Sequence, residues 1–168
     1  MKQARHPVII IGDGVYGRDD GYALLSLIHE LTAKYQIVRD DWNGFNILHN
    51  HASMVGSLDI GFSPSYGGYG IAEILQKAES GTIKLLYLLG SDEIDMNKVK
   101  SSFIVYQGHH GDKGASSADV IFPAASYTEQ DAIYVNFEGR PQYTKAATPL
   151  LGKAREDVII IRDLANSL

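Results

Sequence analysis

Short, continuous apolar runs constrain the fold of this chain more than any other feature of its sequence. None of them alternates apolar with polar residues, which is typical of parallel strands that are covered on both faces. The runs are Val8–Ile11, Ile83–Leu89, Phe103–Tyr106 and Val120–Phe122. Amphipathic helices are predicted between them from the spacing of Leu24, Leu27, Ile28 and Leu31, and of Ile71, Ile74, Leu75 and Ala78. The alternation predicts an α/β fold: a Rossmann-like, mostly parallel sheet with flanking helices.

The segment between the two predicted helices has a weaker pattern. We predict a shorter helix within Trp42–Gly56 that begins near Asn43. The Gly, Ser and Tyr residues of Gly61–Gly70 predict a loop.

The last third of the chain departs from the strand and helix alternation. Ile133–Asn136 and Arg140–Gln142 flank a turn that contains Gly139, which predicts a β-hairpin excursion. Arg155–Leu168 has the spacing of a final helix, although the β-branched run Val158–Ile161 leaves a strand start open there.

Composition narrows the class of protein. With 168 residues we expect a single α/β domain, 1–168, as a fragment of a larger subunit, with residues 1–7 as a disordered start. The net charge of −5 argues against nucleic acid as a partner, and no apolar run is long enough for direct membrane insertion. The absence of cysteine excludes disulfides, thiolate catalysis and Cys-ligated zinc or iron–sulphur clusters in this chain, and it fits a reducing compartment.

A glycine motif follows the first predicted strand. Gly12–Gly17 reads GxGxxG, and in a dinucleotide-binding unit Gly12 and Gly14 would let the pyrophosphate approach a helix N-terminus. The acidic residue that should follow is supplied late, by Asp40 or Asp41. Nearby aspartates also oppose a pyrophosphate, so a ligand-free turn is the simpler interpretation.

Two other strand ends carry polar residues. Gly90 and Ser91 could accept a phosphate, but Asp92 and Glu93 follow directly and favour a solvated turn. After the next strand, His109 and His110 suggest a metal or acid–base site. Successive side chains are expected to point apart, and nothing in the sequence places His49 or His51 nearby as further ligands, so we predict no metal site. No GxSxG elbow is present and Ser91 has no evident base partner, so we predict no catalytic residue. The candidates for cofactor binding are Gly12, Gly14, Gly90, Ser91, His109 and His110.

Several segments taken together resemble one family. They are Asp41–His49, Leu85–Glu93, Val105–Asp112, Ala118–Pro123, Tyr127–Glu129, Tyr134–Arg140 and Ala154–Asp157. In this order they are similar to the C-terminal region of the large iron–sulphur subunit (the G subunit) of NADH-quinone oxidoreductase, respiratory complex I, which is called the 75 kDa subunit in mitochondria. The stretch from Ala118 to Arg140 is also similar to a signature of the wider molybdopterin oxidoreductase superfamily. The resemblance runs from about Val8 to about Leu164.

The resemblance implies a role for the chain. Superfamily enzymes hold a pterin guanine dinucleotide at such strand ends, but complex I members have generally lost it. The family's cluster-ligating cysteines are absent here, so we expect a cofactor-free structural domain, either a cloned fragment or a split gene product, that supports electron transfer from NADH to quinone. Its partners would be the rest of the large iron–sulphur subunit and other hydrophilic-arm subunits, peripheral on the cytoplasmic face of the bacterial inner membrane or on the mitochondrial matrix side. The isolated fragment could form a homodimer. The alternative is a dinucleotide-binding Rossmann-type oxidoreductase domain that uses Gly12–Gly17.

Overall fold

The computed structural model describes residues 3–168, and the first two residues of the expected disordered start lie outside this range. Within it, Pro7 is buried, its carbonyl accepts a hydrogen bond from Trp42 Nε1 at 2.9 Å, and the ring of His6 lies 4.6 Å from that of Trp42. The chain divides into two compact units. The first runs to Ser63 and includes Ile133–Gln142, and the second comprises Pro64–Ala132 and Tyr143–Leu168. Among residues 3–168, no helix is both long and apolar enough to cross a bilayer.

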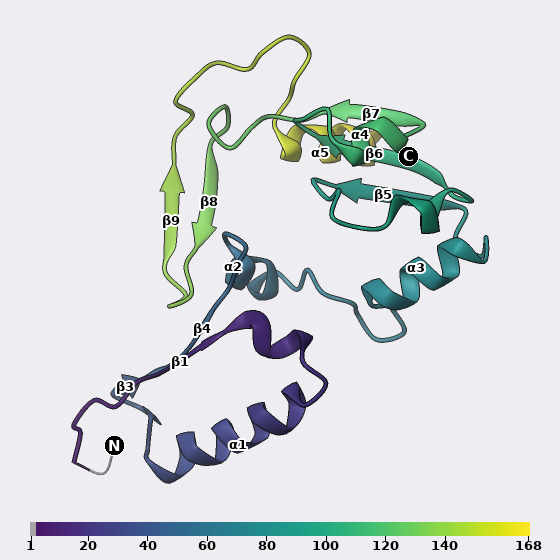
Figure 1. Ribbon diagram of the computed structural model, residues 1–168. Helices are drawn as coiled ribbons and strands as arrows, with labels where there is room; N and C mark the ends of the chain where they lie inside the picture. Colours follow the sequence, from purple (N-terminus) through teal and green to yellow (C-terminus); the bar gives the residue numbers. More distant parts are fainter. Residues whose placement is uncertain (1–2) are drawn as a thin grey trace. The chain divides into compact units, whose positions relative to one another are not determined.

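The first unit is built around a parallel pair of strands joined by a crossover helix (Figure 1). Its elements are β1 (Ile9–Gly12), a 3₁₀ helix (Asp13–Gly17), α1 (Gly21–Lys34), β2 (Val38–Arg39), β3 (Trp42–Asn43), β4 (Phe45–Leu48) and α2 (Met54–Asp59). β1 pairs with β4 in parallel, with Ile9 opposite Phe45 and Gly12 opposite Leu48. β2 and β3 form a short antiparallel corner beside Ile37, which is completely buried.

The predicted helix beginning near Asn43 is wrong, because the first half of Trp42–Gly56 forms β3 and β4 and a helix, α2, begins only at Met54. Gly44 marks the change of direction between them. Its N–H donates to Ile37 O at 2.9 Å, and its own carbonyl accepts from Ile9 N–H at 2.8 Å. A Cβ atom on Gly44 would overlap Pro7 O. The backbone at position 44 therefore lies too close to Pro7 for any residue other than glycine. Pairing with a strand that lies far away in sequence therefore overrides the local helical pattern.

The predicted hairpin is confirmed as β8 (Ala132–Val135) and β9 (Pro141–Thr144). Gly139 lies in its turn with a φ of +80°, where glycine is favoured. Most of the hairpin belongs to the first unit, and Val135 N–H donates to Ser53 Oγ at 3.0 Å. Ser53 itself has a φ of +60°, immediately before α2.

The second unit contains the larger sheet. Its other elements are α3 (Ile71–Glu79), β5 (Leu85–Leu89), a 3₁₀ helix (Met96–Val99), β6 (Phe103–Gly108), α4 (Lys113–Ser117), β7 (Val120–Pro123) and α5 (Asp157–Ser167). The strands pair in the order β5-β6-β7, all parallel, as the apolar runs predict. The final helix is confirmed, and a strand at Val158–Ile161 is not formed.

The core lies on one face of this sheet. Leu88, Ile104 and Tyr106 pack there against Ala78 of α3 and Val99 of the 3₁₀ helix. The opposite face carries the alternate residues of each strand, and α5 covers only part of it. Burial on both faces therefore holds for β6, whose residues after Phe103 are all buried, but not for the flanking strands β5 and β7.

Candidate functional site

The carboxyl ends of β5, β6 and β7 surround a cavity of about 200 Å³. Parallel strands bring their carboxyl ends to one edge of a sheet, so segments far apart in sequence meet there. The cavity is lined by Leu89, Gly90, Gln107, Gly108, His109, Ala124, Ala125, Tyr127, Gln130 and Asp157. The last of these is the first residue of α5, so the helix begins at this edge.

A chain of polar side chains runs through the cavity wall. Gln107 is fully buried, and its Oε1 accepts a hydrogen bond from Tyr87 Oη. Its Nε2 donates to Asp157 Oδ1 at 2.6 Å. Burial, and then the charge of Asp157, raise the pKa of Tyr87. The phenol therefore stays protonated and able to donate to Gln107.

A second polar pair lies on the core face of β6. Tyr106 is 2% exposed, and its Oη donates to an Asp112 carboxylate oxygen. Asp112 also caps α4 by accepting from Ala115 N–H at 2.9 Å. Burial opposes ionisation of Asp112, but the hydrogen bonds from Tyr106 and Ala115 outweigh it and lower its pKa. The same burial and the Asp112 contact raise the pKa of Tyr106.

Of the residues singled out at strand ends, Gly90 and His109 line the cavity. Gly90 has a φ of +59° and donates its N–H to Gln107 O at 2.7 Å. The expectation that His109 and His110 point apart is wrong, because their rings lie 4.3 Å apart, edge to face, on an exposed loop. Within the described part of the chain, three or more His, Asp or Glu residues nowhere gather as a metal site would require.

The Gly12–Gly17 motif lies in the first unit and forms a 3₁₀ helix rather than opening directly into α1. Neither Gly12 nor Gly14 has a positive φ, and a Cβ on either would meet no atom within 4 Å. The carboxylate of Asp13 accepts hydrogen bonds from Asn50 N and Nδ2, both at 2.8 Å. The steric reasons for glycine in a dinucleotide loop are therefore absent from this turn.

Sequence analysis places Tyr87, Gln107 and Asp157 within segments that carry the family resemblance, but it assigns none of them to a site. Gln107 does offer one signal, since a polar side chain closes an otherwise apolar run. No spacing pattern links Asp157 to Gln107, because Asp157 lies 50 residues further along the chain.

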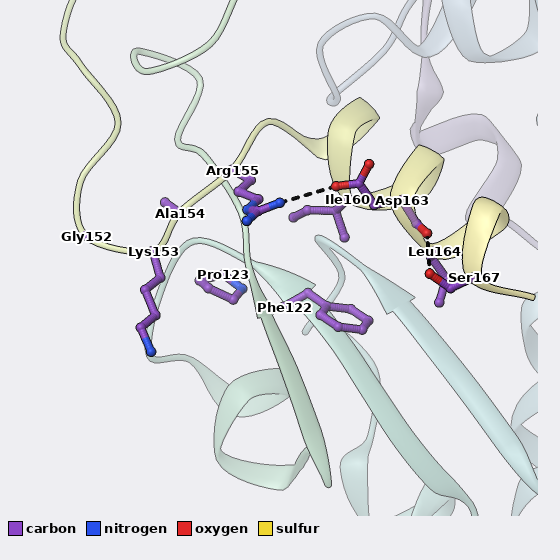
Figure 2. A pocket seen from close by; sticks show the side chains of 10 residues that line it. All are labelled: Phe122, Pro123, Gly152, Lys153, Ala154, Arg155, Ile160, Asp163, Leu164 and Ser167. Atoms are coloured by element: carbon purple, nitrogen blue, oxygen red, sulfur yellow. Dashed lines mark hydrogen bonds and ion pairs between the residues drawn. The ribbon is translucent and has the colours of Figure 1, made fainter.

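A larger, open groove of about 770 Å³ lies between β7 and α5 in the second unit. Figure 2 shows the ring of Phe122 below Leu164 and Ile160 of α5, with Lys153 extending away from the helix. Arg155 Nη1 contacts Asp163 Oδ2 at 3.2 Å across the upper side of the groove. The floor is apolar and the charges lie at the edges.

The strand-end cavity by itself does not fit a pterin guanine dinucleotide. Pockets for ligands of drug size occupy roughly 300–1,000 Å³, and the strand-end cavity has about 200 Å³. Among the residues that the structure describes, no Lys or Arg lines it, and Asp157 places a carboxylate at the helix N-terminus where a diphosphate would bind. No chemical step through such a group can be assigned to these residues.

Comparison with known proteins places the chain in a family. It is 60% identical over its full length to the G subunit of NADH-quinone oxidoreductase from Rickettsia bellii (strain RML369-C) and covers 23% of that protein. It is 46% identical over its full length to the NADH-ubiquinone oxidoreductase 75 kDa subunit of Reclinomonas americana, of which it covers 24%. For the mitochondrial NADH dehydrogenase [ubiquinone] iron-sulfur protein 1 of Solanum tuberosum, identity is 42% over 98% of the chain and 21% of the relative.

The chain thus spans less than a quarter of the length of each of these relatives. The family model for molybdopterin oxidoreductase matches residues 1–167, nearly all of the chain. The chain therefore belongs to the molybdopterin oxidoreductase family.

Proposed function

We propose that this chain is a structural module of the large iron–sulphur subunit of NADH-quinone oxidoreductase. It holds no redox group of its own and supports electron transfer from NADH to quinone in the hydrophilic arm of the complex. One observation carries the proposal: the whole chain matches bacterial and mitochondrial relatives of this subunit, yet it contains no cysteine that could ligate an iron–sulphur cluster.

The first unit supports a role inside a larger assembly. β1 and β4 form a sheet of only two parallel strands, an arrangement that is marginally stable without further strands or packed helices. No residue of α1 is buried except Gly21, although its leucines have the spacing of a packing face. Surfaces of this kind are usual where a domain meets other parts of the same protein. The proposed partners are the rest of the large iron–sulphur subunit and neighbouring hydrophilic-arm subunits.

The proposed location follows from the same role. The relatives are named as subunits of an oxidoreductase that acts on quinone or ubiquinone. A module of its hydrophilic arm would be peripheral, on the cytoplasmic face of a bacterial inner membrane or the matrix side of the mitochondrial one.

A hybrid subunit tests the proposal. This chain replaces the matching segment of the Rickettsia bellii relative, and the hybrid is assembled with the other subunits of that complex. We expect assembly and NADH–quinone activity within about twofold of the parent, because the segment supplies shape rather than chemistry. The unmodified parent and a subunit from which the segment has been deleted are the controls. Iron–sulphur absorption in the purified chain alone, or assembly that needs no segment at all, would contradict the proposal.

A further inference from the structure

The sheet of the second unit has one face that its own helices only partly cover. Side chains alternate along a strand, so Tyr87, Val105 and Phe122 lie opposite the core residues Leu88, Ile104 and Tyr106. On the core face, α3, α4 and the 3₁₀ helix Met96–Val99 all supply packing residues. On the other face, α5 contacts the sheet through the hydrogen bond between Gln107 of β6 and Asp157 of α5.

The part of this face that α5 leaves open is apolar. Leu85 and Phe103 are paired neighbours on β5 and β6 and are 58% and 48% exposed, and Val120 of β7 is 37% exposed. Sheets made only of parallel strands occur almost always with both faces covered. This exposed apolar patch at the amino-terminal ends of the three strands therefore indicates a packing surface rather than a solvent-facing one.

The groove beside α5 lies at the edge strand β7. Strands lie about 4.8 Å apart, and packed helices lie about 8–10 Å apart. α5 contacts the central strand β6, and a helix about 8–10 Å from it would lie about two strand spacings away, along the outer edge of β7. The groove has its floor there, at Phe122, and Ile160 and Leu164 form its wall.

The charged side chains at the groove indicate which charge a bound helix would carry near Lys153. Asp163 is already paired with Arg155 and Arg162, each at 3.2 Å. Lys153 lines the groove and forms no ion pair with any residue in the range 3–168. A carboxylate on the occupant would complete this site, although the molecule as a whole carries a net charge of −5.

We infer that this groove and the adjoining exposed face of β7 receive an amphipathic helix from the part of the large iron–sulphur subunit that lies outside these residues. Its apolar side chains would contact Phe122 in the groove and Val120 next to it on β7, and a carboxylate would lie near Lys153. The inference rests on the proposed function. More than three quarters of each relative lies beyond the matched segment. A helix on the same polypeptide binds at an effective concentration in the millimolar range, which favours it over a separate subunit.

Photocrosslinking in the hybrid complex tests this. In one variant, p-benzoyl-phenylalanine replaces Val120. In the control variant it replaces Lys98, which is exposed elsewhere on the second unit. We expect the probe at position 120 to crosslink to the same polypeptide outside the 168 residues. Lys153→Glu should lower that yield by about threefold, because it reverses one charge of an ion pair, and Lys98→Glu should leave it unchanged.

The outcomes separate the two proposals. Crosslinks from position 120 to another subunit, to a second copy or to residues within this chain would overturn the inference alone, as would the absence of any crosslink in an assembled complex. A hybrid that fails to assemble would overturn the proposed function and the inference with it.

Discussion

The side-chain amide of Gln107 is fully buried. It accepts a hydrogen bond from Tyr87 and donates one to Asp157. Gln107→Leu keeps the volume but removes both contacts, and Asp157 then loses a donor at the start of α5. We expect the free energy of unfolding to fall by about 2 kcal/mol, as measured by urea denaturation. Gln76→Leu, on the exposed surface of α3, is the control and should change it little. Equal stability of the two variants would contradict the prediction, because the two hydrogen bonds of Gln107 would then contribute nothing to the free energy of unfolding.

Glycine is required by packing at position 108 and not at position 12. A Cβ on Gly108 would overlap the Tyr106 ring and its hydroxyl, whereas a Cβ on Gly12 would meet nothing within 4 Å. Gly12 also has an ordinary extended backbone, with a φ of −76°. Gly108→Ala should therefore cost about 2–3 kcal/mol through displacement of the Tyr106 ring, and Gly12→Ala should be neutral within about 0.5 kcal/mol. Thermal unfolding of both variants checks the contrast, and a larger loss at Gly12 would contradict it by showing a packing constraint at Gly12 instead.

Asp112 should make stability depend on pH in the acid range. Its folded-state pKa lies below the ordinary value, because the hydrogen bonds from Tyr106 and Ala115 outweigh burial. A lowered pKa stabilises the folded state above the unfolded-state pKa of about 4, and this contribution is lost as pH falls through the folded-state value. Asp112→Asn should thus be less stable than the parent at neutral pH, with the difference shrinking as the pH falls below about 4. Urea midpoints across this range test it, and a constant difference would contradict it.

At the scale of elements, one serine holds the hairpin. Val135 N–H donates to Ser53 Oγ across 82 residues of sequence, and Ser53 has a φ of +60°. Ser53→Ala and Ser53→Gly both remove the acceptor, but glycine also relieves the left-handed backbone, which costs other residues roughly 1 kcal/mol. We expect Ser53→Ala to be the less stable by about 1 kcal/mol in thermal unfolding. The reverse order would show that this backbone conformation carries no strain.

The elements that can be predicted correctly from the sequence are those whose pattern is local. β5, β6 and β7 are apolar runs, and α1 and α3 have helical spacing, so each can be found without knowledge of its partners. β4 cannot, because it is a strand through its pairing with β1 and the close passage of Gly44 past Pro7. Secondary-structure propensity can be seen in neighbouring residues of the sequence, whereas strand pairing depends on residues that are distant in the sequence.

The candidate site divides in the same way. Gly90 and His109 can be found because ligand sites tend to lie beyond strand ends, and both do line the cavity. Asp157 joins that cavity from a helix 50 residues beyond Gln107, and no spacing in the sequence indicates that the two meet. The geometry of a site assembled from separate segments is set by the sheet, and the sequence alone specifies only some of its members.

At the scale of the whole molecule, the uncovered face of the second unit should make the isolated chain associate with itself. Leu85, Phe103 and Val120 are exposed there and form an apolar patch at the amino-terminal ends of the strands. Sedimentation velocity should show a concentration-dependent dimer, and Val120→Asp should raise its dissociation constant at least about tenfold, because each copy would bury an aspartate in place of a valine. Val158→Asp changes a valine that is 64% exposed on α5 and serves as the matched control. If both variants weakened association equally, non-specific hydrophobic contact would explain it, whereas a selective effect at Val120 would identify the same face that we assign to a helix in the complete subunit.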